Sequence, residues 1–191
     1  FSEDAGTRIP PRGILVPVSI GENVAVYFRT VVCFNPARIF KEDFNMTIKE
    51  LFKLKLGESV RILNKPFTYV GYAKINLDSE GSMRWIYNDE NGMLAISPED
   101  EEIMLFQEVE TDLEPDGDTL MFKEKEYEFN SEETGAVIDT HGESVAEADE
   151  TFIVSDYKTA EGEILRIVNN EGTGENLVYI GKYVSEDDIV E

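Results

Sequence analysis

The stretch GESVRILNKPFTYVGYA, residues 57–73, is central to the fold because its pattern recurs in GDTLMFKEKEYEFNSEE, residues 117–133. Each copy has a glycine, a short segment with strand periodicity, a turn that contains a lysine, and a second strand with two aromatic residues on one face. At an offset of 60 residues, Gly57, Ser59, Val60, Lys65, Phe67 and Tyr69 match Gly117, Thr119, Leu120, Lys125, Tyr127 and Phe129. We interpret the match as an internal duplication, with chance similarity between two β-hairpins as the alternative. A duplication predicts that the aromatic pairs of the two copies occupy equivalent core positions.

The chain beyond Gly57 has the sequence pattern of short antiparallel strands separated by turns. Apolar and polar residues alternate with a period of two, and turn signals such as Asn91-Gly92 and Asp116-Gly117 recur between them. Asn91-Gly92 is the strongest hairpin signal, because both residues tolerate the positive φ of a type I′ turn. The predicted fold class is therefore all-β, with two similar small antiparallel sheets or barrel-like halves and one short helix on the N-terminal side.

One segment, MTIKELFKLKLG at residues 46–57, predicts that helix. Thr47 is a candidate N-cap, Glu50 follows at the capping-box spacing, and Gly57 is a stop signal. We expect the helix to span residues 47–55.

The predicted domain organisation has three parts. They are an N-terminal extension with a strand pair (1–45), a first β-rich half (46–112) and a second β-rich half (113–191), with the halves packed as one unit. The single cysteine, Cys33, rules out an internal disulfide, and its apolar neighbours favour a buried side chain over a nucleophile. One cysteine favours the cytosol, and the N-terminal residues lack a signal-peptide pattern.

Charge divides the chain unevenly. Residues 1–56 hold eight Lys/Arg and six Asp/Glu, whereas residues 57–191 hold nine and 34, a net charge of −25. Such a surface repels phosphate backbones and anionic lipid, so the sequence predicts neither direct nucleic-acid binding nor membrane insertion. It attracts basic proteins, polyamines or divalent cations, although acidity often serves solubility alone.

Four short motifs run through residues 47–191. They comprise Leu54, Gly57 and Val60; Tyr69, Val70 and Gly71; the strand at Trp85, Ile86 and Tyr87; and Asp156, Tyr157, Gly162 and Leu165. In this order they resemble the bacterial domain-of-unknown-function family 4178. The segment after Trp85 departs from the family pattern, because it lacks an acidic-aromatic pair and a second tryptophan. Members of the family resemble accessory proteins encoded near phage-shock-type membrane-stress proteins and polyamine-modifying enzymes. The resemblance therefore implies a non-catalytic adaptor.

The motifs and the aromatic strands supply candidate ligand- or partner-binding residues. These are Trp85, Tyr87, Asp156 and Tyr157. Aromatic residues at alternating strand positions belong to the core more often than to a ligand site, so core packing is the alternative.

Carboxylates provide the one candidate metal site, Glu114, Asp116 and Asp118 in EPDGDT. The EF-hand spacing is absent, and Asp-Gly turn chemistry explains these residues equally well. The sequence has no His/Cys cluster for zinc and no phosphate-binding glycine motif, so no cofactor is predicted.

His141, the only histidine, lies close to Asp139 and Ser144. These are the residue types of a nucleophilic triad, but nearness in sequence is not triad geometry, and His-Gly is an ordinary turn pair. A hydrolase centred on His141 ranks third among the functional hypotheses.

The leading prediction is a non-catalytic, acidic protein-interaction module, an adaptor or accessory protein with a basic partner in a bacterial membrane-stress or polyamine-related system. The alternative is a small-ligand or cation-binding domain for a polyamine or Ca²⁺. A deep pocket lined by converging carboxylates and an aromatic residue favours the alternative, whereas a filled interior favours the interaction module. No pattern in the sequence predicts an oligomeric state.

Overall fold

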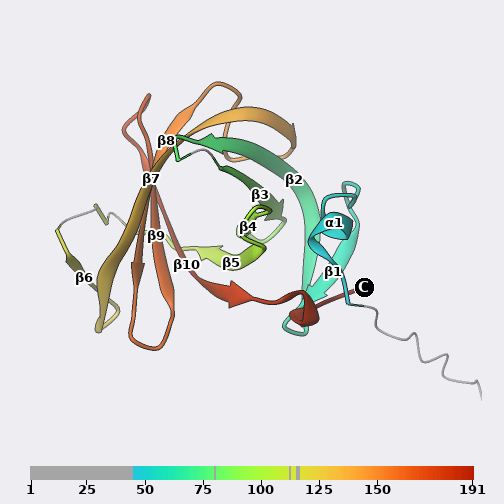
Figure 1. Cartoon of the computed structure of the whole chain (residues 1–191), viewed down its shortest axis with the longest axis horizontal. Coiled ribbons are helices and arrows are strands. Elements are labelled where there is room, and N and C mark those ends of the chain that lie inside the picture. The colour runs from blue at the N-terminus through green and yellow to red at the C-terminus, as the bar shows by residue number, and fades with distance from the viewer. Residues whose placement is uncertain (1–44, 80, 112, 115–116) are drawn as a thin grey trace, which may run out of the picture. The chain divides into compact units, whose positions relative to one another are not determined.

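Alternating apolar residues and regular turn residues produce strands along most of the described chain (Figure 1). The computed structural model describes residues 45–79, 81–111, 113–114 and 117–191, all within the compact unit Glu42–Glu191. The elements are α1 (Ile48–Leu51), β1 (Ser59–Ile62), β2 (Lys65–Leu77), β3 (Ser82–Asn88), β4 (Gly92–Ser97), β5 (Glu102–Glu108), β6 (Thr119–Phe122), β7 (Lys125–Gly142), β8 (Thr151–Lys158), β9 (Ile164–Asn170), β10 (Asn176–Val184), the 3₁₀ helix η1 (Glu186–Asp188) and β11 (Ile189–Val190).

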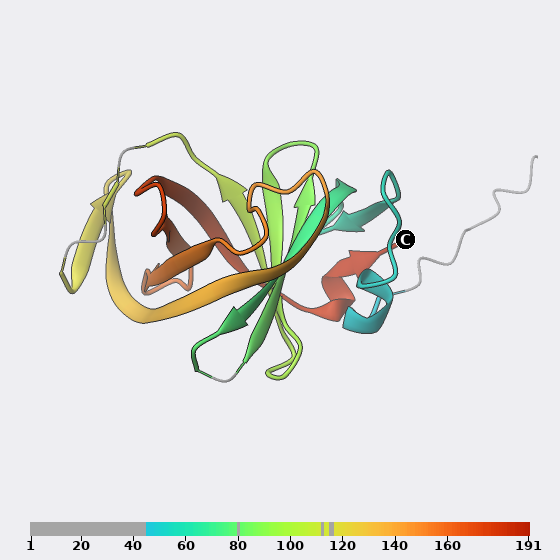
Figure 2. The ribbon, with the colours of Figure 1, turned by 90° about the horizontal axis from the view of Figure 1, so that it is seen from above.

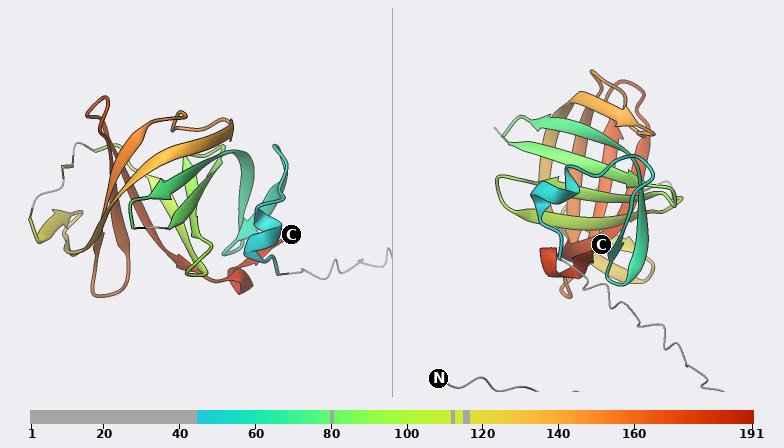
Figure 3. Two further views of the ribbon diagram at one scale, coloured as in Figure 1. Left: turned by 45° about the horizontal axis from the view of Figure 1, so that its top comes forward. Right: turned by 90° about the vertical axis from the view of Figure 1, so that its right-hand side faces the viewer.

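Eight of these strands close into one antiparallel barrel. Their order around the ring is β2, β3, β4, β5, β10, β9, β8 and β7, and the pairing of β2 with β7 closes it. Each half of the sequence contributes four neighbouring strands, and the halves meet at the β2–β7 and β5–β10 seams. The hairpin strands β1 and β6 extend beyond the ring from β2 and β7 (Figures 2 and 3). The all-β prediction is confirmed, and the two halves share a single barrel.

The hairpins that open the two halves have the same backbone geometry. Val60 is the Cα partner of Phe67, and 60 residues later Leu120 is the partner of Tyr127. Both hairpins turn through two residues with positive φ: Leu63 (51°) and Asn64 (65°) in the first, Lys123 (48°) and Glu124 (64°) in the second. Two positive φ values in a row are typical of a type I′ turn.

A β-bulge in each long strand redirects its side chains. The register shifts between Tyr69 and Gly71 in β2, and at the matching place between Phe129 and Ser131 in β7. A bulge bends the strand and increases its twist. In β2 this turns the buried residues from a cluster outside the barrel, which includes Tyr69, to the barrel interior, which includes Ala73.

The barrel interior is filled by side chains. This interior cluster consists of Ala73, Ile75, Trp85, Tyr87, Met93, Ala95, Met104, Phe106, Val137, Ala146, Phe152, Val154, Ile164, Val168 and Tyr179. The rings of Trp85 and Phe152 pack with their centroids 5.9 Å apart, and those of Phe106 and Tyr179 pack edge to face at 6.3 Å. Such tilted arrangements are the preferred geometry of aromatic pairs.

Two further apolar clusters lie outside the barrel, one under each opening hairpin. The first outer cluster contains Met46, Leu51, Val60, Ile62, Phe67, Tyr69, Ile86, Leu94, Ile96, Ile103, Val184 and Ile189. The second outer cluster contains Leu120, Tyr127, Tyr157, Leu165, Ile167 and Val178.

The aromatic pairs of the two hairpins are only partly equivalent. Phe67, Tyr69 and Tyr127 are buried as predicted, but Phe129 is 45% exposed, so the prediction for Phe129 is wrong. The physical reason is coverage: residues of α1 and β11 pack on the first outer cluster, and no described element takes their place on the second.

The predicted helix over residues 47–55 is too long, because α1 has four residues, Ile48–Leu51. The Glu50 carboxylate accepts the Thr47 backbone N–H at 2.8 Å, so the reciprocal side of the predicted capping interaction forms. The helix ends early because the following chain must reach β2, where Gly57 N–H donates to the Tyr69 carbonyl at 2.8 Å.

The Asn91-Gly92 hairpin forms between β3 and β4, but its turn differs from the predicted one. Tyr87 pairs with Met93, so five residues form the connection, and among them only Asn91 has positive φ, 58°. The Asn88 side-chain oxygen accepts the backbone N–H groups of Glu90 and Gly92 and so stabilises this longer turn.

Several predictions concern residues outside the described part of the chain. They are the N-terminal strand pair within 1–45, the buried side chain of Cys33 and the ligand role of Asp116. Within the described ranges, no helix combines the length and apolar character that crossing a membrane requires.

Candidate functional site at the open end of the barrel

An ion pair inside the barrel is the main polar feature of the interior. Asp156 on β8 and Arg166 on β9 are cross-strand partners, and both side chains are buried, with 8% and 1% of their surfaces exposed. Arg166 Nε donates to Asp156 Oδ1 at 2.8 Å, and Nη2 donates to Oδ2 at 2.7 Å. This bidentate geometry matches the planar guanidinium to the planar carboxylate and largely offsets the cost of burying two charges.

The rest of the Arg166 guanidinium contacts soft, polarisable groups. Nη1 lies 3.7 Å from Met83 Sδ, Nη2 lies 3.7 Å from Met104 Sδ, and the guanidinium carbon is 4.5 Å from the centre of the Phe106 ring. Thioether sulfurs are weak acceptors, and the ring adds a cation–π attraction. Arg166 is therefore held in place on several sides.

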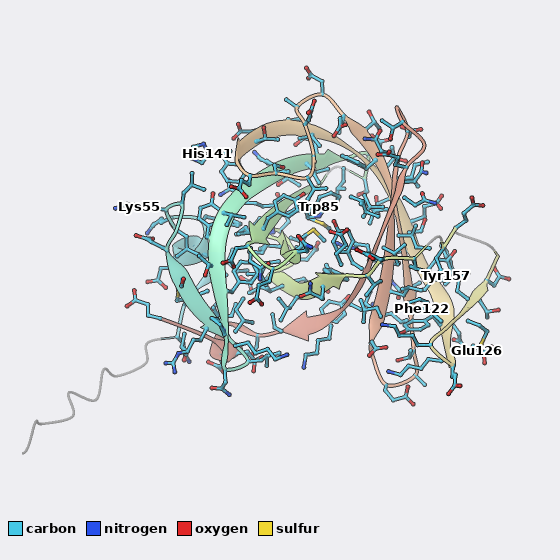
Figure 4. All side chains as sticks on the ribbon, turned by 180° about the vertical axis from the view of Figure 1, so that it is seen from behind. Lys55, Trp85, Phe122, Glu126, His141 and Tyr157 are labelled. Carbon is cyan, nitrogen blue, oxygen red and sulfur yellow. The ribbon has the colours of Figure 1, made fainter. Side chains whose placement is uncertain are left out.

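Trp85 joins the same network. Its Nε1 donates to Met83 Sδ at 3.0 Å, the sulfur that also contacts Arg166. Trp85 and Asp156, two of the predicted site residues, are thus linked through Met83 and Arg166. Figure 4 shows Trp85 within the ring of strands.

The ion pair borders a hollow of about 590 Å³ at one end of the barrel. Its charged lining residues are Glu99, Asp100, Glu102, Glu133, Asp156, Lys158 and Arg166, five carboxylates against two cations. Met83, Met104 and Tyr183 also line the hollow. We call these three residues and the charged lining residues the open end of the barrel. A hollow of this size falls within the range of small-molecule sites.

Hydrogen bonds fix several side chains around this hollow. Ser97 Oγ donates to the Asp100 carboxylate at 2.7 Å. Lys158, a cation that lines the hollow, is also held in place. Its Nζ donates to the Tyr183 hydroxyl at 3.0 Å and lies 4.9 Å from the centre of the Tyr183 ring. Lys158 is thereby held by an aromatic residue and not by a carboxylate.

The loop between β7 and β8 packs into the barrel elsewhere, where the interior is apolar. Ala146 of this loop belongs to the interior cluster. Burial is the main cause that raises the pKa of Tyr87, and a hydrogen bond with Ser144 of the same loop opposes it. Burial likewise raises the pKa of Tyr179. Both phenols are therefore neutral at physiological pH. Among the described residues, the charged groups of the interior are those of the Asp156–Arg166 ion pair.

The structure brings together only two of the four predicted binding residues. Trp85 and Asp156 meet in the network at the open end. Tyr87 lies in the interior cluster outside that network, and Tyr157 lies in the second outer cluster, where its ring packs edge to face on Phe129 at 5.6 Å. Figure 4 shows Tyr157 away from Trp85, toward the β6 hairpin.

Of the candidate metal ligands the structure describes Glu114 and Asp118 but not Asp116, so this site stays a prediction. Glu114 and Asp118 are exposed, and among the described residues no group of three or more His, Cys, Asp or Glu could hold a metal ion. His141 is exposed on β7, and Asp139 accepts its hydrogen bond from the Tyr72 hydroxyl at 2.7 Å, whereas Ser144 Oγ accepts the Ala146 N–H. His141, Asp139 and Ser144 therefore do not form a nucleophilic triad in the structure.

Sequence reasoning missed Arg166 and its two methionine contacts. A signal for Arg166 was available, because it interrupts the apolar run ILRIV in β9, and a charge in a strand that is otherwise buried requires a partner. Met83 and Met104 carry no such signal, since methionine is an ordinary core residue.

Comparison with known proteins places the chain in a family. The family model described as "Domain of unknown function (DUF4178)" matches residues 55–186, more than half of the chain. The chain belongs to the DUF4178 family. The sequence resemblance is thereby confirmed, and the matched DUF4178 region spans both barrel halves and the open end. No curated protein and no solved structure matches the chain.

Proposed function

We propose that this DUF4178 domain is a non-catalytic binding module that recognises a basic partner protein, and that the open end of the barrel receives a lysine or arginine side chain of that partner. The observation that carries the proposal is the unequal charge around the hollow of about 590 Å³. Because Asp156 and Arg166 neutralise each other, Lys158 is the one remaining cation among the described residues that line the hollow, against Glu99, Asp100, Glu102 and Glu133. A cationic group that enters gains this attraction where water is partly excluded.

The packing of the interior supports a partner side chain over an enclosed small molecule. Fifteen residues fill the barrel interior, and Glu99, Asp100 and Glu102 of the hollow are exposed to solvent. A long basic side chain has the matching shape, since its alkyl stem can lie along Met83, Met104 and Val154 while its charged head meets the carboxylates.

The wider charge of the domain supports the same partner chemistry. The net charge of −25 over residues 57–191 steers basic molecules toward the domain and repels nucleic acid and anionic lipid. We also infer that the two halves arose by internal duplication, with support from the matching hairpin registers, turns and bulges. The proposal retains the expected cytoplasmic setting in a bacterium.

The test uses Trp85, the only tryptophan of the chain, as a fluorescent reporter beside the hollow. The probe is a short acetylated and amidated peptide with one lysine, and a second peptide with one arginine. We expect the triple variant Glu99→Gln, Glu102→Gln and Glu133→Gln to bind the better peptide at least about tenfold more weakly, a loss of about 1.4 kcal/mol.

The matched control removes the same charge elsewhere. Glu110→Gln, Glu171→Gln and Glu175→Gln change three exposed carboxylates that do not line the hollow. If both triple variants lose affinity equally, overall acidity and not the open end is responsible. If neither peptide binds the unmodified domain at low salt, the proposal is wrong.

A free polyamine is the second candidate, and the exposed ring of Tyr183 beside the carboxylates favours it. Aromatic faces attract ammonium groups, so the ring and the carboxylates can share one polyamine. Spermidine in the same titration distinguishes the candidates: binding much tighter than that of either peptide supports the polyamine, and weaker binding supports the protein partner. Calcium is tested in parallel, with unfolding temperature as the readout.

A further inference from the structure

A cationic site lies on the outer surface of the barrel, away from the ion pair. The guanidinium carbon of Arg84, on β3, is 4.2 Å from the centre of the Phe52 ring and 4.6 Å from the centre of the Tyr72 ring. Stacking on two rings orients the group and uses its delocalised charge, but it engages none of the five N–H donors. Arg84 is partly exposed, so those donors can reach a ligand from solvent.

Arg84 has no acidic partner among the described residues. It forms no ion pair there and donates no hydrogen bond, in contrast to Arg166, whose donors are used on Asp156. This is unexpected in a chain with 40 Asp and Glu against 17 Lys and Arg. A surface arginine that needs only charge neutralisation would readily find a carboxylate in such a chain.

A second cation stands directly opposite. Lys74 on β2 is the cross-strand partner of Arg84, and both side chains are partly buried. Like charges at directly opposite positions destabilise a sheet. Asp139 opposes Lys74 on the other side, but its carboxylate accepts the Tyr72 hydroxyl at 2.7 Å and lies beyond ion-pair distance of Lys74.

Apolar and aromatic side chains continue this surface along the β2–β7 seam. The Tyr72 and His141 rings lie 6.0 Å apart. Leu56, 47% exposed, packs against Gly142, where an added Cβ would lie 2.6 Å from Leu56 Cδ2. Figure 4 shows His141 on this outer side of the strand ring.

We propose that Arg84 and Lys74 form a carboxylate-binding site, in which the guanidinium fork of Arg84 holds the carboxylate in plane and the Lys74 ammonium supplies the second charge. The site is separate from the acidic open end and does not depend on the function proposed for it. A ligand carboxylate relieves the repulsion between the two cations and satisfies donors that the stacking leaves unused. A singly charged carboxylate also suits this chain better than a multiply charged phosphate, because the net charge of −23 opposes each added negative charge.

The carboxylate can come from a small acid or from a residue with an apolar neighbour, and three probes separate these sources. They are acetate, N-acetyl-leucine and N-acetyl-leucinamide, titrated at constant ionic strength while the Arg84 Nε–Hε signal is followed by NMR. We expect saturable shifts with both acids and none with the neutral amide. If N-acetyl-leucine binds more tightly than acetate, the apolar surface around Leu56 contributes to the affinity. If the two acids bind equally, the site recognises the carboxylate alone.

Variants test the roles of the two cations. Arg84→Lys keeps the charge but loses the fork, and Lys74→Gln keeps the fork but loses the second charge; we expect each to weaken N-acetyl-leucine binding at least about fivefold. Lys182→Gln, an exposed lysine on β10, is the matched control and is expected to change binding less than about twofold. Backbone amide spectra verify that each variant is folded. Non-saturable shifts, equal shifts with the amide, or unchanged binding by a folded Arg84→Lys variant would each overturn the proposal.

Discussion

Arg166 and Asp156 face each other across β9 and β8 inside the barrel and share two hydrogen bonds of 2.8 and 2.7 Å. Met93 and Tyr87 form the corresponding cross-strand pair of the first half, between its second and third barrel strands, and that pair has no charge. The barrel is therefore closed by similar strands in both halves, but among the described residues the buried ion pair of its interior belongs to the second half. The ion pair of the second half lies beside the acidic hollow, because both of its residues line that hollow.

Breaking this ion pair on one side is expected to be strongly destabilising. Arg166→Met leaves Asp156 buried without its partner and should lower the free energy of unfolding by about 3–5 kcal/mol, measured by urea denaturation at pH 7. The double variant Asp156→Leu/Arg166→Met removes both charges and should recover most of that loss. A cost of less than about 1 kcal/mol for Arg166→Met would show that the pair is effectively solvated.

A second prediction concerns the β2–β7 seam, where Gly71 lets two backbones approach. An added Cβ at residue 71 would lie 2.2 Å from the Glu143 carbonyl oxygen and 2.6 Å from the His141 carbonyl oxygen. Backbone atoms cannot move aside as a flexible side chain can, so Gly71→Ala should destabilise the domain by at least about 2 kcal/mol in the same urea assay.

Gly81→Ala is the control for this glycine. Among the described residues, its added Cβ would meet only Leu77 Cδ1, at 3.8 Å, and its φ does not lie in the left-handed region. We expect a change within about 0.5 kcal/mol. Equal effects of the two substitutions would show that loss of backbone freedom, and not the close approach, sets the cost.

Local patterns predicted much of this fold. Period-two alternation and glycine turns predicted the strands, and the repeat at an offset of 60 residues predicted two hairpins that prove to have the same register. The turns themselves were less predictable, because Lys123 and Glu124 adopt the positive φ that Asn-Gly would favour. Tertiary pairing overrides local preference at these positions.

Closure of the barrel and the polar network depend on contacts that local patterns do not encode. The β2–β7 seam pairs Ile75 with Val137, residues far apart in sequence, and either strand alone looks like an ordinary sheet strand. The DY motif selected Asp156, and the charge of Arg166 interrupts an apolar strand, but the pairing of the two becomes identifiable only when the β8–β9 register is known.

The β6–β7 turn offers a gain in stability. Lys123 and Glu124 have φ of 48° and 64°, a conformation that is strained for residues with a Cβ. Lys123→Asn with Glu124→Gly should stabilise the hairpin by about 1 kcal/mol, detected as slower hydrogen exchange of β6 amides and a higher urea midpoint. The control, Lys123→Ala with Glu124→Ala, removes the same charges but keeps the strain and should give no gain.

Tyr127 and Glu163 link the second outer cluster to the β8–β9 turn and make stability depend on pH. The Tyr127 hydroxyl donates to the Glu163 carboxylate, and Lys125 Nζ lies 3.0 Å from the same oxygen. The hydrogen bond from Tyr127 is the largest of the causes that lower the pKa of Glu163. Burial acts in the opposite direction and raises this pKa, and the interactions with Lys125 lower it further. A carboxyl whose pKa is lower in the folded state stabilises the fold above its unfolded pKa, and this contribution is lost as the pH falls through the folded value.

Tyr127→Phe should therefore lower the free energy of unfolding by about 1–2 kcal/mol at pH 7. At pH values below the ordinary pKa of glutamate, the difference in unfolding free energy between the variant and the unmodified domain should become smaller. Glu163 is then protonated in the unfolded state, and at still lower pH it is protonated in the folded state of both proteins as well. Urea denaturation at pH 7 and at about pH 3 measures both differences. Tyr69→Phe is the matched control, since Tyr69 is buried in the first outer cluster and burial raises the pKa of its phenol without any glutamate partner. A Tyr127→Phe penalty that is the same at both pH values would contradict the assigned hydrogen bond, because it would place the loss in packing against the second outer cluster.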